Sequence, residues 1–330
     1  DRRVRAEDDL MAISEAPLLA VVESARAKPK RGRPGATSAP PAAVGATTTE
    51  AAGKRVGQIL VDTSKLTPDD VERVLERQRT TGGRFGNAAV ALKLVSHDDV
   101  QHALARQFNY PYLRAGEGGL SAELIAAFNP FSRQVESLRM LRAQLVLRWF
   151  ETGHRTLAFV SPGVDSGRSF LLANLAVVFS QLGQRTLLID ADLRGGRQHT
   201  LFNLGNETGL TTALMGRPAA SAIVTLPQFV GLSVLPAGPV PPNPLELLSG
   251  PTFRALLDQA RTEYDVILID TPDGELSADA QTIAARAGGV VLVARRDHTR
   301  SSALQKLENN MSSVGATIVG TVLNNARPHA

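Results

Sequence analysis

A series of short apolar runs divides the second half of the chain, beginning with TLAFV at residues 156–160. The others are TLLIDAD at 186–192, LSVLPAG at 232–238, DVILIDTP at 265–272, GGVVLVARR at 288–296 and ATIVGTVLNN at 316–325. Sequences typical of helices lie between most of them, and QVESLRMLRAQLVLRWF at 134–150 predicts one helix before the first run. Continuous β-branched runs that alternate with helices indicate a mostly parallel sheet covered by helices on both faces.

A different, helical pattern fills residues 54–115 and occurs twice. RVGQILVDTSKLTPDDVERVLERQ starts at Arg55, and RFGNAAVALKLVSHDDVQHALARQ starts at Arg84, an offset of 84 − 55 = 29 residues. Each copy predicts a short helix, a turn with Thr67 or Ser96 as N-cap, and a second helix. A fixed period indicates one supersecondary unit used twice, hence a small helical tandem-repeat domain. The predicted buried faces of the second helices are Val71, Val74 and Leu75 in one copy and Val100, Ala103 and Leu104 in the other.

Composition adds boundaries to this picture. Residues 1–35 are rich in charge and end in RAKPKRGRPG, whereas residues 36–53 are small, Pro-bearing and low in charge, which is typical of a flexible linker. We therefore predict a charged segment (1–35), a linker (36–53), the repeat domain (54–115), a connector (116–131) and the α/β domain (132–330).

Several classes of protein are excluded or disfavoured. The 330 residues contain no cysteine, which excludes disulfides, thiolate metal sites and a cysteine nucleophile. None of the apolar runs approaches the ~18 residues that a membrane-spanning helix needs, and DRRVRAEDDL lacks the apolar core of a signal peptide. The net charge of +4 is too small to imply a nucleic-acid partner by itself.

The loop SPGVDSGRS, residues 161–169, stands between a predicted strand and a predicted helix. A phosphate loop needs consecutive backbone N–H groups at the positive end of a helix, and Gly163 and Gly167 supply the backbone freedom. The pattern G-x-x-x-x-G-K-S/T would place glycine at Pro162 and lysine at Arg168. An ordinary strand–helix turn is the alternative. The predicted nucleotide contacts are Gly163, Val164, Asp165, Ser166, Gly167, Arg168, Ser169 and Phe170.

Three aspartates strengthen the prediction of a nucleotide site. Asp190 and Asp192 follow one apolar run, and Asp270 ends another. The carboxyl ends of parallel strands meet in the crevice where ligands bind such sheets. Mg²⁺ prefers oxygen ligands and keeps part of its water shell, so carboxylates here predict a magnesium site.

These motifs together carry a family resemblance that covers roughly residues 131–326. TLLIDADLR resembles the second Walker motif of bacterial tyrosine kinases of capsule and exopolysaccharide export, and LPAGPVPPNPLELL is similar to their Pro-rich signature. VESLRMLRAQL resembles their E-x-x-R-x-x-R assembly motif. The chain is most similar to the EpsG-type branch, which works with a polysaccharide co-polymerase. The resemblance implies a P-loop NTPase fold.

The resemblance also implies roles for individual residues. Ser169, Asp192 and Asp270 would hold Mg²⁺ directly or through water, and Arg168 would place a cation on the phosphates. Asp190 would accept the tyrosine hydroxyl proton. Asn324, which follows the last apolar run, would read the adenine edge; no N-K-x-D guanine motif is present, so ATP is favoured over GTP.

Glu136, Arg139 and Arg142 match the assembly motif and imply a ring-shaped homo-oligomer. Their spacing places them on one helix face, and an ordinary solvated face is the alternative.

The repeat resembles the amino-terminal domain of type II secretion and pilus ATPases, which binds cyclic di-GMP. Arg55, Gly57, Arg84 and Gly86 match its motif, whereas Ser64 and Lys93 replace its later glycine. A docking module without ligand is the alternative. KPKRGRPG looks like an AT-hook, but a single copy beside a linker does not predict nucleic-acid binding.

Residues 1–23, DRRVRAEDDLMAISEAPLLAVVE, resemble the cytoplasmic tail of Wzz-type polysaccharide co-polymerases. The resemblance implies a membrane partner whose tail is present in cis, docked through Leu18, Leu19, Val21 and Val22, and a location at the cytoplasmic face of the membrane.

The expected function is therefore an ATP-dependent protein-tyrosine autokinase that regulates exopolysaccharide chain length or export. The rivals are a catalytically weak nucleotide-gated scaffold and a cyclic di-GMP sensor. The family's Tyr-rich tail is missing, which favours the scaffold. Tyr110 and Tyr112, in NYPYL, are the expected acceptors, because Pro111 disfavours a helix there. Tyr264 precedes a core strand and is a poor substrate.

Overall fold

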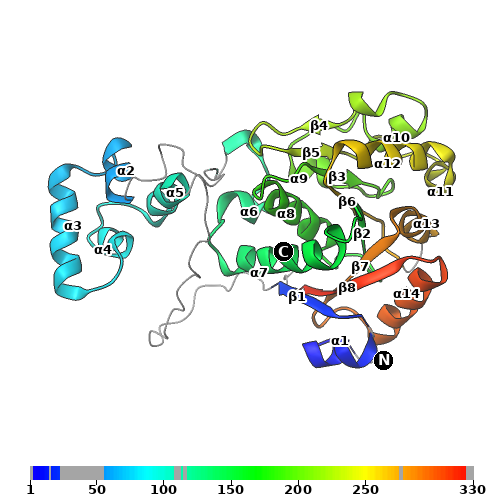
Figure 1. Ribbon diagram of the computed structural model, residues 1–330, viewed down its shortest axis with the longest axis horizontal. Coiled ribbons are helices and arrows are strands. Elements are labelled where there is room, and N and C mark those ends of the chain that lie inside the picture. Colours follow the sequence, from blue (N-terminus) through cyan, green and yellow to red (C-terminus); the bar gives the residue numbers. More distant parts are fainter. Residues whose placement is uncertain are drawn as a thin grey trace. The chain divides into compact units, whose positions relative to one another are not determined.

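A computed structural model describes residues 3–14, 16–22, 56–107, 113, 117–274 and 278–324 (Figure 1). The chain divides into two compact units, one made of residues 1–25 and 115–330 and the other of residues 26–114. The larger unit contains the sheet, and the smaller contains the helical repeat.

The sheet has eight strands in the order β1-β8-β7-β2-β6-β3-β5-β4. All neighbours are parallel except the β4–β5 pair, which confirms the predicted mostly parallel sheet. Strands β2, β3, β5 and β6 are buried along their whole length, as expected for continuous apolar runs. The strands are β1 (Leu18–Val22), β2 (Thr156–Val160), β3 (Thr186–Asp190), β4 (Val224–Thr225), β5 (Leu232–Leu235), β6 (Val266–Asp270), β7 (Gly289–Arg295) and β8 (Thr317–Asn324).

Helices cover both faces of the sheet, as predicted (Figure 1). One face is covered by α6 (Ile125–Phe128), α7 (Arg133–Leu145, extended by a π-helical turn, Val146–Phe150) and α8 (Arg168–Ser180). The other is covered by α12 (Pro251–Glu263), α13 (Ala278–Ala287) and α14 (Ser301–Ser313). The remaining helices are α9 (Gln198–Leu201), α10 (Leu210–Leu214) and α11 (Pro244–Ser249), with 3-10 turns at Glu117–Gly119 and Ala219–Ser221.

The segment before α6 belongs structurally to this unit. The buried side chain of Asn174 on α8 accepts a hydrogen bond from the N–H of Ala126 (2.9 Å) and donates one to the carbonyl of Glu123 (2.9 Å). The connector is therefore fastened to the helix that follows the phosphate loop.

The N-terminal segment contributes a strand that the sequence analysis did not identify. After α1 (Glu7–Ile13), strand β1 pairs in parallel with β8 and becomes the edge of the sheet (Figure 1). Leu19 and Val22, two of the predicted anchor residues, are buried, and so is Val4. The backbone of Val4 also bonds the turn after β7, donating to Thr299 (2.9 Å) and accepting from Asp297 (2.8 Å).

The helical unit interlocks its two repeats. Helix α2 (Val56–Asp62) packs on α5 (His97–Gln107), and α3 (Pro68–Thr81) packs on α4 (Phe85–Ala91), so each pair joins both copies. Thr67 and Ser96 cap α3 and α5, accepting from the N–H groups of Asp70 (3.2 Å) and Asp99 (3.1 Å). Leu75, which we predicted to be buried, is 39% exposed, because α3 packs through the narrower stripe around Val74.

The positions that replace the family glycine keep a glycine-like backbone. Ser64 has φ +55° and Lys93 has φ +57°, both in the left-handed region. Side-chain-bearing residues occupy this region at a cost of roughly 1–2 kcal/mol each. The turn geometry is therefore retained without the glycine.

No helix in the described ranges combines the length and apolar composition needed to cross a bilayer.

Candidate nucleotide site

The loop between β2 and α8 forms a cradle for an anion. Asp165 (φ +56°) and Gly167 (φ +76°) adopt the left-handed conformation, and α8 begins at Arg168. Within the described part of the chain, the backbone N–H groups of residues 164–169 donate no hydrogen bond to another residue. Free N–H groups at the N-terminus of a 13-residue helix form an anion-binding site.

Side-chain hydrogen bonds to backbone carbonyls stabilise the conformation of the loop. The Ser166 hydroxyl donates to the carbonyl of Gly163 (2.8 Å), and Arg295 donates to that of Asp165 (2.7 Å). The fully buried Asn324 donates to the carbonyl of Ser166 (2.9 Å) and leaves no space for a Cβ at Gly167. Asn324 thus supports the phosphate loop, and its contact with an adenine edge stays a prediction.

The three predicted aspartates meet beside this loop. Asp190 and Asp270 are register partners at the carboxyl ends of β3 and β6, and neither is exposed. Asp192 follows β3, and 17% of its side chain is exposed. One Asp192 oxygen accepts from the backbone N–H groups of Arg194 (3.2 Å) and Gly195 (2.9 Å), which fixes its orientation.

Burial makes these carboxyls difficult to ionise. Desolvation, followed by the charge of Asp270, raises the pKa of Asp190 well above its usual value. Desolvation also raises the pKa of Asp192, although the Gly195 N–H group and Arg168 oppose the shift. The site is therefore poor in positive charge relative to its carboxylates.

Arg168 faces the carboxylates. Its Nε donates to Asp270 Oδ1 (2.9 Å), and its Nη1 donates to the hydroxyl of Ser161 (2.6 Å). Its Nη2 lies 3.9 Å from Asp192 Oδ2, and the side chain is 9% exposed. The family resemblance implies that Arg168 places a cation on the phosphates, and this stays a prediction; in this structure the guanidinium pairs with the buried carboxylate of Asp270.

Gln198 is a site residue that sequence reasoning missed. Its backbone N–H donates to Asp190 (2.9 Å), and its side-chain amide donates to Asp270 Oδ2 (2.8 Å) and to the carbonyl of Ser169 (3.1 Å). Gln198 is fully buried, and its Oε1 has no hydrogen-bond partner among the described residues. No periodicity marks it; the one available signal is its position just after the Asp-rich motif.

The residues present fit a magnesium ion held largely by hydroxyl, phosphate and water oxygens. The unpaired Oε1 of Gln198 and the partly exposed carboxylate of Asp192 offer oxygen atoms beside Ser169. In the described ranges no three His, Cys, Asp or Glu side chains cluster to hold a metal ion by themselves. Ser169 could act directly, and Asp192 and Asp270 could act through water.

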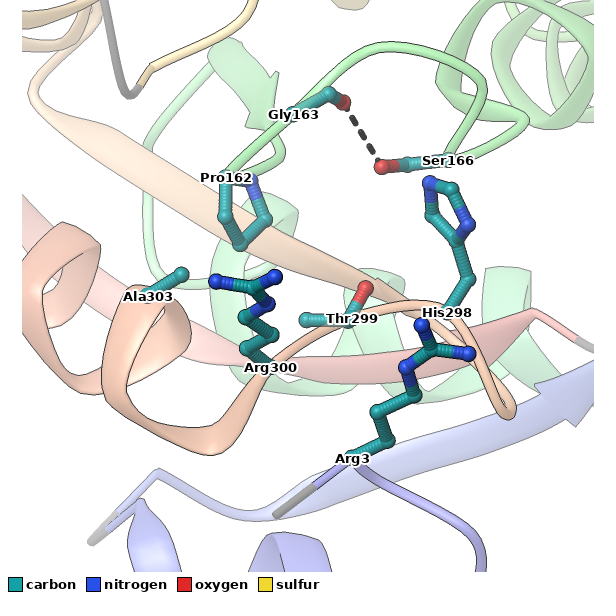
Figure 2. A pocket seen from close by; sticks show the side chains of 8 residues that line it. All are labelled: Arg3, Pro162, Gly163, Ser166, His298, Thr299, Arg300 and Ala303. Atoms are coloured by element: carbon teal, nitrogen blue, oxygen red, sulfur yellow. Dashed lines mark hydrogen bonds between the residues drawn. The ribbon is translucent and has the colours of Figure 1, made fainter. Parts of the chain in front are cut away.

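A basic cavity of about 250 Å³ flanks the loop (Figure 2). It joins the N-terminal segment, the loop and the connection between β7 and α14, and its basic side chains are Arg3, His298 and Arg300. Its lining residues are Arg3, Pro162, Gly163, Ser166, His298, Thr299, Arg300 and Ala303.

The assembly-motif residues make contacts inside the chain. Arg139 pairs with Glu136 (3.0 Å) and donates to the carbonyl of Pro130 (2.5 Å), and Arg142 donates to that of Val178 (2.6 Å). The same helix and its extension expose Met140 (55%) and Leu147 (61%). Arg139 and Arg142 thus bond backbone carbonyls of their own chain, and the assembly role of the motif stays a prediction.

Two glycines of the predicted cyclic di-GMP motif are packing positions. A Cβ at Gly57 would lie 3.1 Å from the ring of Phe85, and one at Gly86 would lie 2.5 Å from Val100. Arg84 is exposed at the N-cap of α4, and Arg55 lies outside the described residues.

The tyrosines predicted as acceptors, Tyr110 and Tyr112, also lie outside the described residues. Tyr264 is partly buried against the core just before β6.

Replacing Asp190 with Asn should stabilise the protein in a pH-dependent way. Because the folded-state pKa of Asp190 is raised, folding favours its protonated form, and this stability is lost as the pH rises through that pKa. At pH 8 in magnesium-free buffer, the free energy of unfolding of Asp190→Asn should therefore exceed that of wild type by about 1–2 kcal/mol. This difference should disappear toward pH 4.

The matched control is Asp265→Asn, for which we expect the opposite effect on stability. Hydrogen bonding to Arg185 is the main cause that lowers the pKa of Asp265 to about 2, so Asp265→Asn should lower the melting temperature above pH 4. A gap for Asp190→Asn that does not change with pH would contradict the prediction.

Comparison with known proteins identifies relatives over the α/β unit. The tyrosine-protein kinase YwqD of Bacillus subtilis is 34% identical over 213 residues, 64% of this chain and 90% of the relative. The tyrosine-protein kinase Etk of Escherichia coli K12 is 35% identical over 200 residues, 61% of this chain but 28% of the relative. This chain thus spans less than a third of Etk. No protein-family model matches the chain.

Solved structures of related proteins superpose on the α/β unit. The kinase domain of Escherichia coli Etk superposes with a TM-score of 0.60 at 35% identity, covering 63% of this chain and 81% of that domain. The chimerical protein CapA2B2 superposes with a TM-score of 0.60 at 29% identity, covering 68% of this chain and 99% of that protein. The α/β unit has the predicted P-loop NTPase fold, and the chain belongs to the bacterial tyrosine-protein kinases.

Proposed function

We propose that the protein is an ATP-dependent protein-tyrosine kinase. The observation that carries the proposal is the cradle of free N–H groups at residues 164–169 beside three strand-end aspartates. An anion-binding loop next to carboxylates is the arrangement that phosphoryl transfer needs, because positioning and charge stabilisation supply most of the catalysis.

The residues take distinct roles in this proposal. The loop N–H groups would bind the β- and γ-phosphates of ATP, Ser169 would hold Mg²⁺ directly, and Asp192 and Asp270 would hold it through water. Magnesium neutralises charge on the phosphates when it is bound. Asp190 is fully enclosed, whereas Asp192 is partly exposed and also has a raised pKa. We therefore place acceptance of the tyrosine proton at Asp192, with Asp190 ordering the loop behind it.

The test is incubation of the full chain with ATP and Mg²⁺, followed by phosphosite mapping. We expect phosphotyrosine at Tyr110 or Tyr112, lost in a Ser169→Ala variant that still melts like wild type. Bound nucleotide without any phosphotyrosine, either in this chain or on an added Tyr-rich peptide, would leave the scaffold function instead.

The biological setting is part of the same proposal. Klebsiella pneumoniae has a relative named from its cps region, 35% identical over 201 residues, which supports a role in exopolysaccharide chain length or export. We propose that residues 3–22 act as the tail of a Wzz-type co-polymerase held in cis, which would place the protein at the cytoplasmic face of the membrane. Two observations support this role: β1 pairs with β8 as an edge strand of the sheet, and Arg3 lines the cavity beside the loop.

We also propose a homo-oligomeric ring formed through α7, supported by the exposed Met140 and Leu147. Light scattering on the full chain measures the oligomeric state, and a monomer at all concentrations would contradict the ring.

One observation favours the scaffold as the second candidate. Arg168 contacts Asp270 and Ser161, so the loop cation is engaged away from the phosphate cradle. Cyclic di-GMP binding has weaker support, because Gly57 and Gly86 are explained by packing.

A further inference from the structure

Arg168 occupies the position between the two carboxylates that we expected to hold a metal ion. Its guanidinium is 2.9 Å from Asp270 and 3.9 Å from Asp192, and only 9% of the side chain is exposed. A third contact, to the Ser161 hydroxyl, fixes the group at 2.6 Å. All three guanidinium nitrogens are therefore oriented toward this side of the site.

Asp270 depends on this contact. Its side chain is fully buried, one oxygen accepts from Arg168, and the other accepts from Gln198 at 2.8 Å. A buried carboxylate that loses its cationic partner is strongly destabilised, because the neutral amide of Gln198 cannot replace the lost charge. Arg168 can leave Asp270 only if another cation takes its place.

The choice of arginine matters for this exchange. The planar guanidinium donates to Asp270 and Ser161 at once while its third nitrogen lies near Asp192. An ammonium group is a point charge on a flexible stem and cannot match this fork. Lysine at position 168 would therefore be released from the carboxylates more easily.

We propose that Arg168 is an internal counter-cation that closes the metal position in the nucleotide-free protein, so that Mg²⁺ and nucleotide must bind together. Phosphates alone would draw Arg168 from Asp270 and leave that carboxylate unpaired. Magnesium alone would meet a site already neutralised by the guanidinium. When both bind, the ion compensates the carboxylates and the guanidinium moves to the phosphates. This inference rests on the proposed nucleotide binding.

The experiment compares ADP affinity in Mg²⁺ with ADP affinity in EDTA, by calorimetry, for wild type and Arg168→Lys. We expect magnesium to strengthen ADP binding more in wild type than in the variant, by a factor within the 5- to 150-fold typical of coupled sites. Arg185→Lys is the matched control, because Arg185 also pairs with a carboxylate, Asp265 (2.8 Å), at the opposite end of β3. Arg185→Lys should leave the ratio of ADP affinity in Mg²⁺ to ADP affinity in EDTA at the wild-type value.

A second measurement needs no variant. Mn²⁺ used as a probe for the metal should bind wild-type protein weakly in electron paramagnetic resonance, and ADP should tighten it by the same factor by which the metal tightens ADP. Mn²⁺ that binds equally well with and without ADP would overturn the proposal.

The other outcomes are also decisive. Equal ratios in wild type and Arg168→Lys would show that Arg168 does not gate the metal. If wild type binds ADP equally tightly in EDTA and in Mg²⁺, the guanidinium replaces the ion permanently. That result would also overturn the proposal. No ADP binding by wild type in Mg²⁺ would overturn the proposed function as well, so the two failures are distinguishable.

Discussion

Gly167→Ala should lower ADP affinity by about 10-fold or more. Gly167 has φ +76°, where a side chain costs roughly 1–2 kcal/mol, and the new Cβ would collide with the amide of Asn324. Because Asn324 is buried and bonded to the carbonyl of Ser166, the loop must move instead, and its N–H groups would no longer converge. Calorimetric titration with Mg·ADP measures the loss.

The same loop provides a matched control for this substitution. A Cβ at Gly163 meets no atom within 4 Å, and its φ is not in the left-handed region. Gly163→Ala should therefore retain ADP affinity within a few-fold. Similar losses in both variants would contradict the role assigned to the Gly167–Asn324 contact.

Deleting residues 1–22 should lower the melting temperature of the α/β unit by several degrees. The segment buries Val4, Leu10, Leu19 and Val22 and contributes the edge strand β1 to the sheet. It also holds the turn after β7 and contributes Arg3 to the cavity beside the loop, so ADP affinity should fall by the 5- to 150-fold of typical coupling. Thermal melting and ADP titration measure the two effects.

Two further samples separate docking from chain length. A synthetic peptide of residues 1–22 should restore melting temperature and ADP affinity to the deletion variant. In the full-length chain, Gly320→Val should reproduce the deletion, because a Cβ there would collide with Leu19 on β1. A deletion variant as stable as wild type, with the same ADP affinity, would reduce the segment to a passive extension.

The central strands could be predicted because burial on both faces produces continuous apolar runs, as in TLAFV and DVILID. Strand β1 could not, because LLAVV lies in a charged segment almost 300 residues from β8, and no local pattern specifies so distant a partner. Strand β4 has two residues and no detectable period.

In the site, too, some residues could be predicted from the sequence and others could not. Asp190, Asp192 and Asp270 could be placed together because strand ends converge. The direction of Arg168 could not be predicted, because it depends on which buried charge lies within reach after folding. Gln198 and Asn324 owe their positions to tertiary packing, so their sequence neighbours carry no signal of the contacts they make.

Among the described residues, β1 and β8 are the first and last strands, yet they are neighbours in the sheet, with the helical unit inserted in the sequence after β1. Because nearly 300 residues separate the two strands, the contact between them resembles one between two polypeptides. A break anywhere between residues 22 and 56 would turn the protein into a complementing pair without altering the sheet. In evolutionary terms, a one-chain protein of this design and a two-component one are a single fusion or fission event apart.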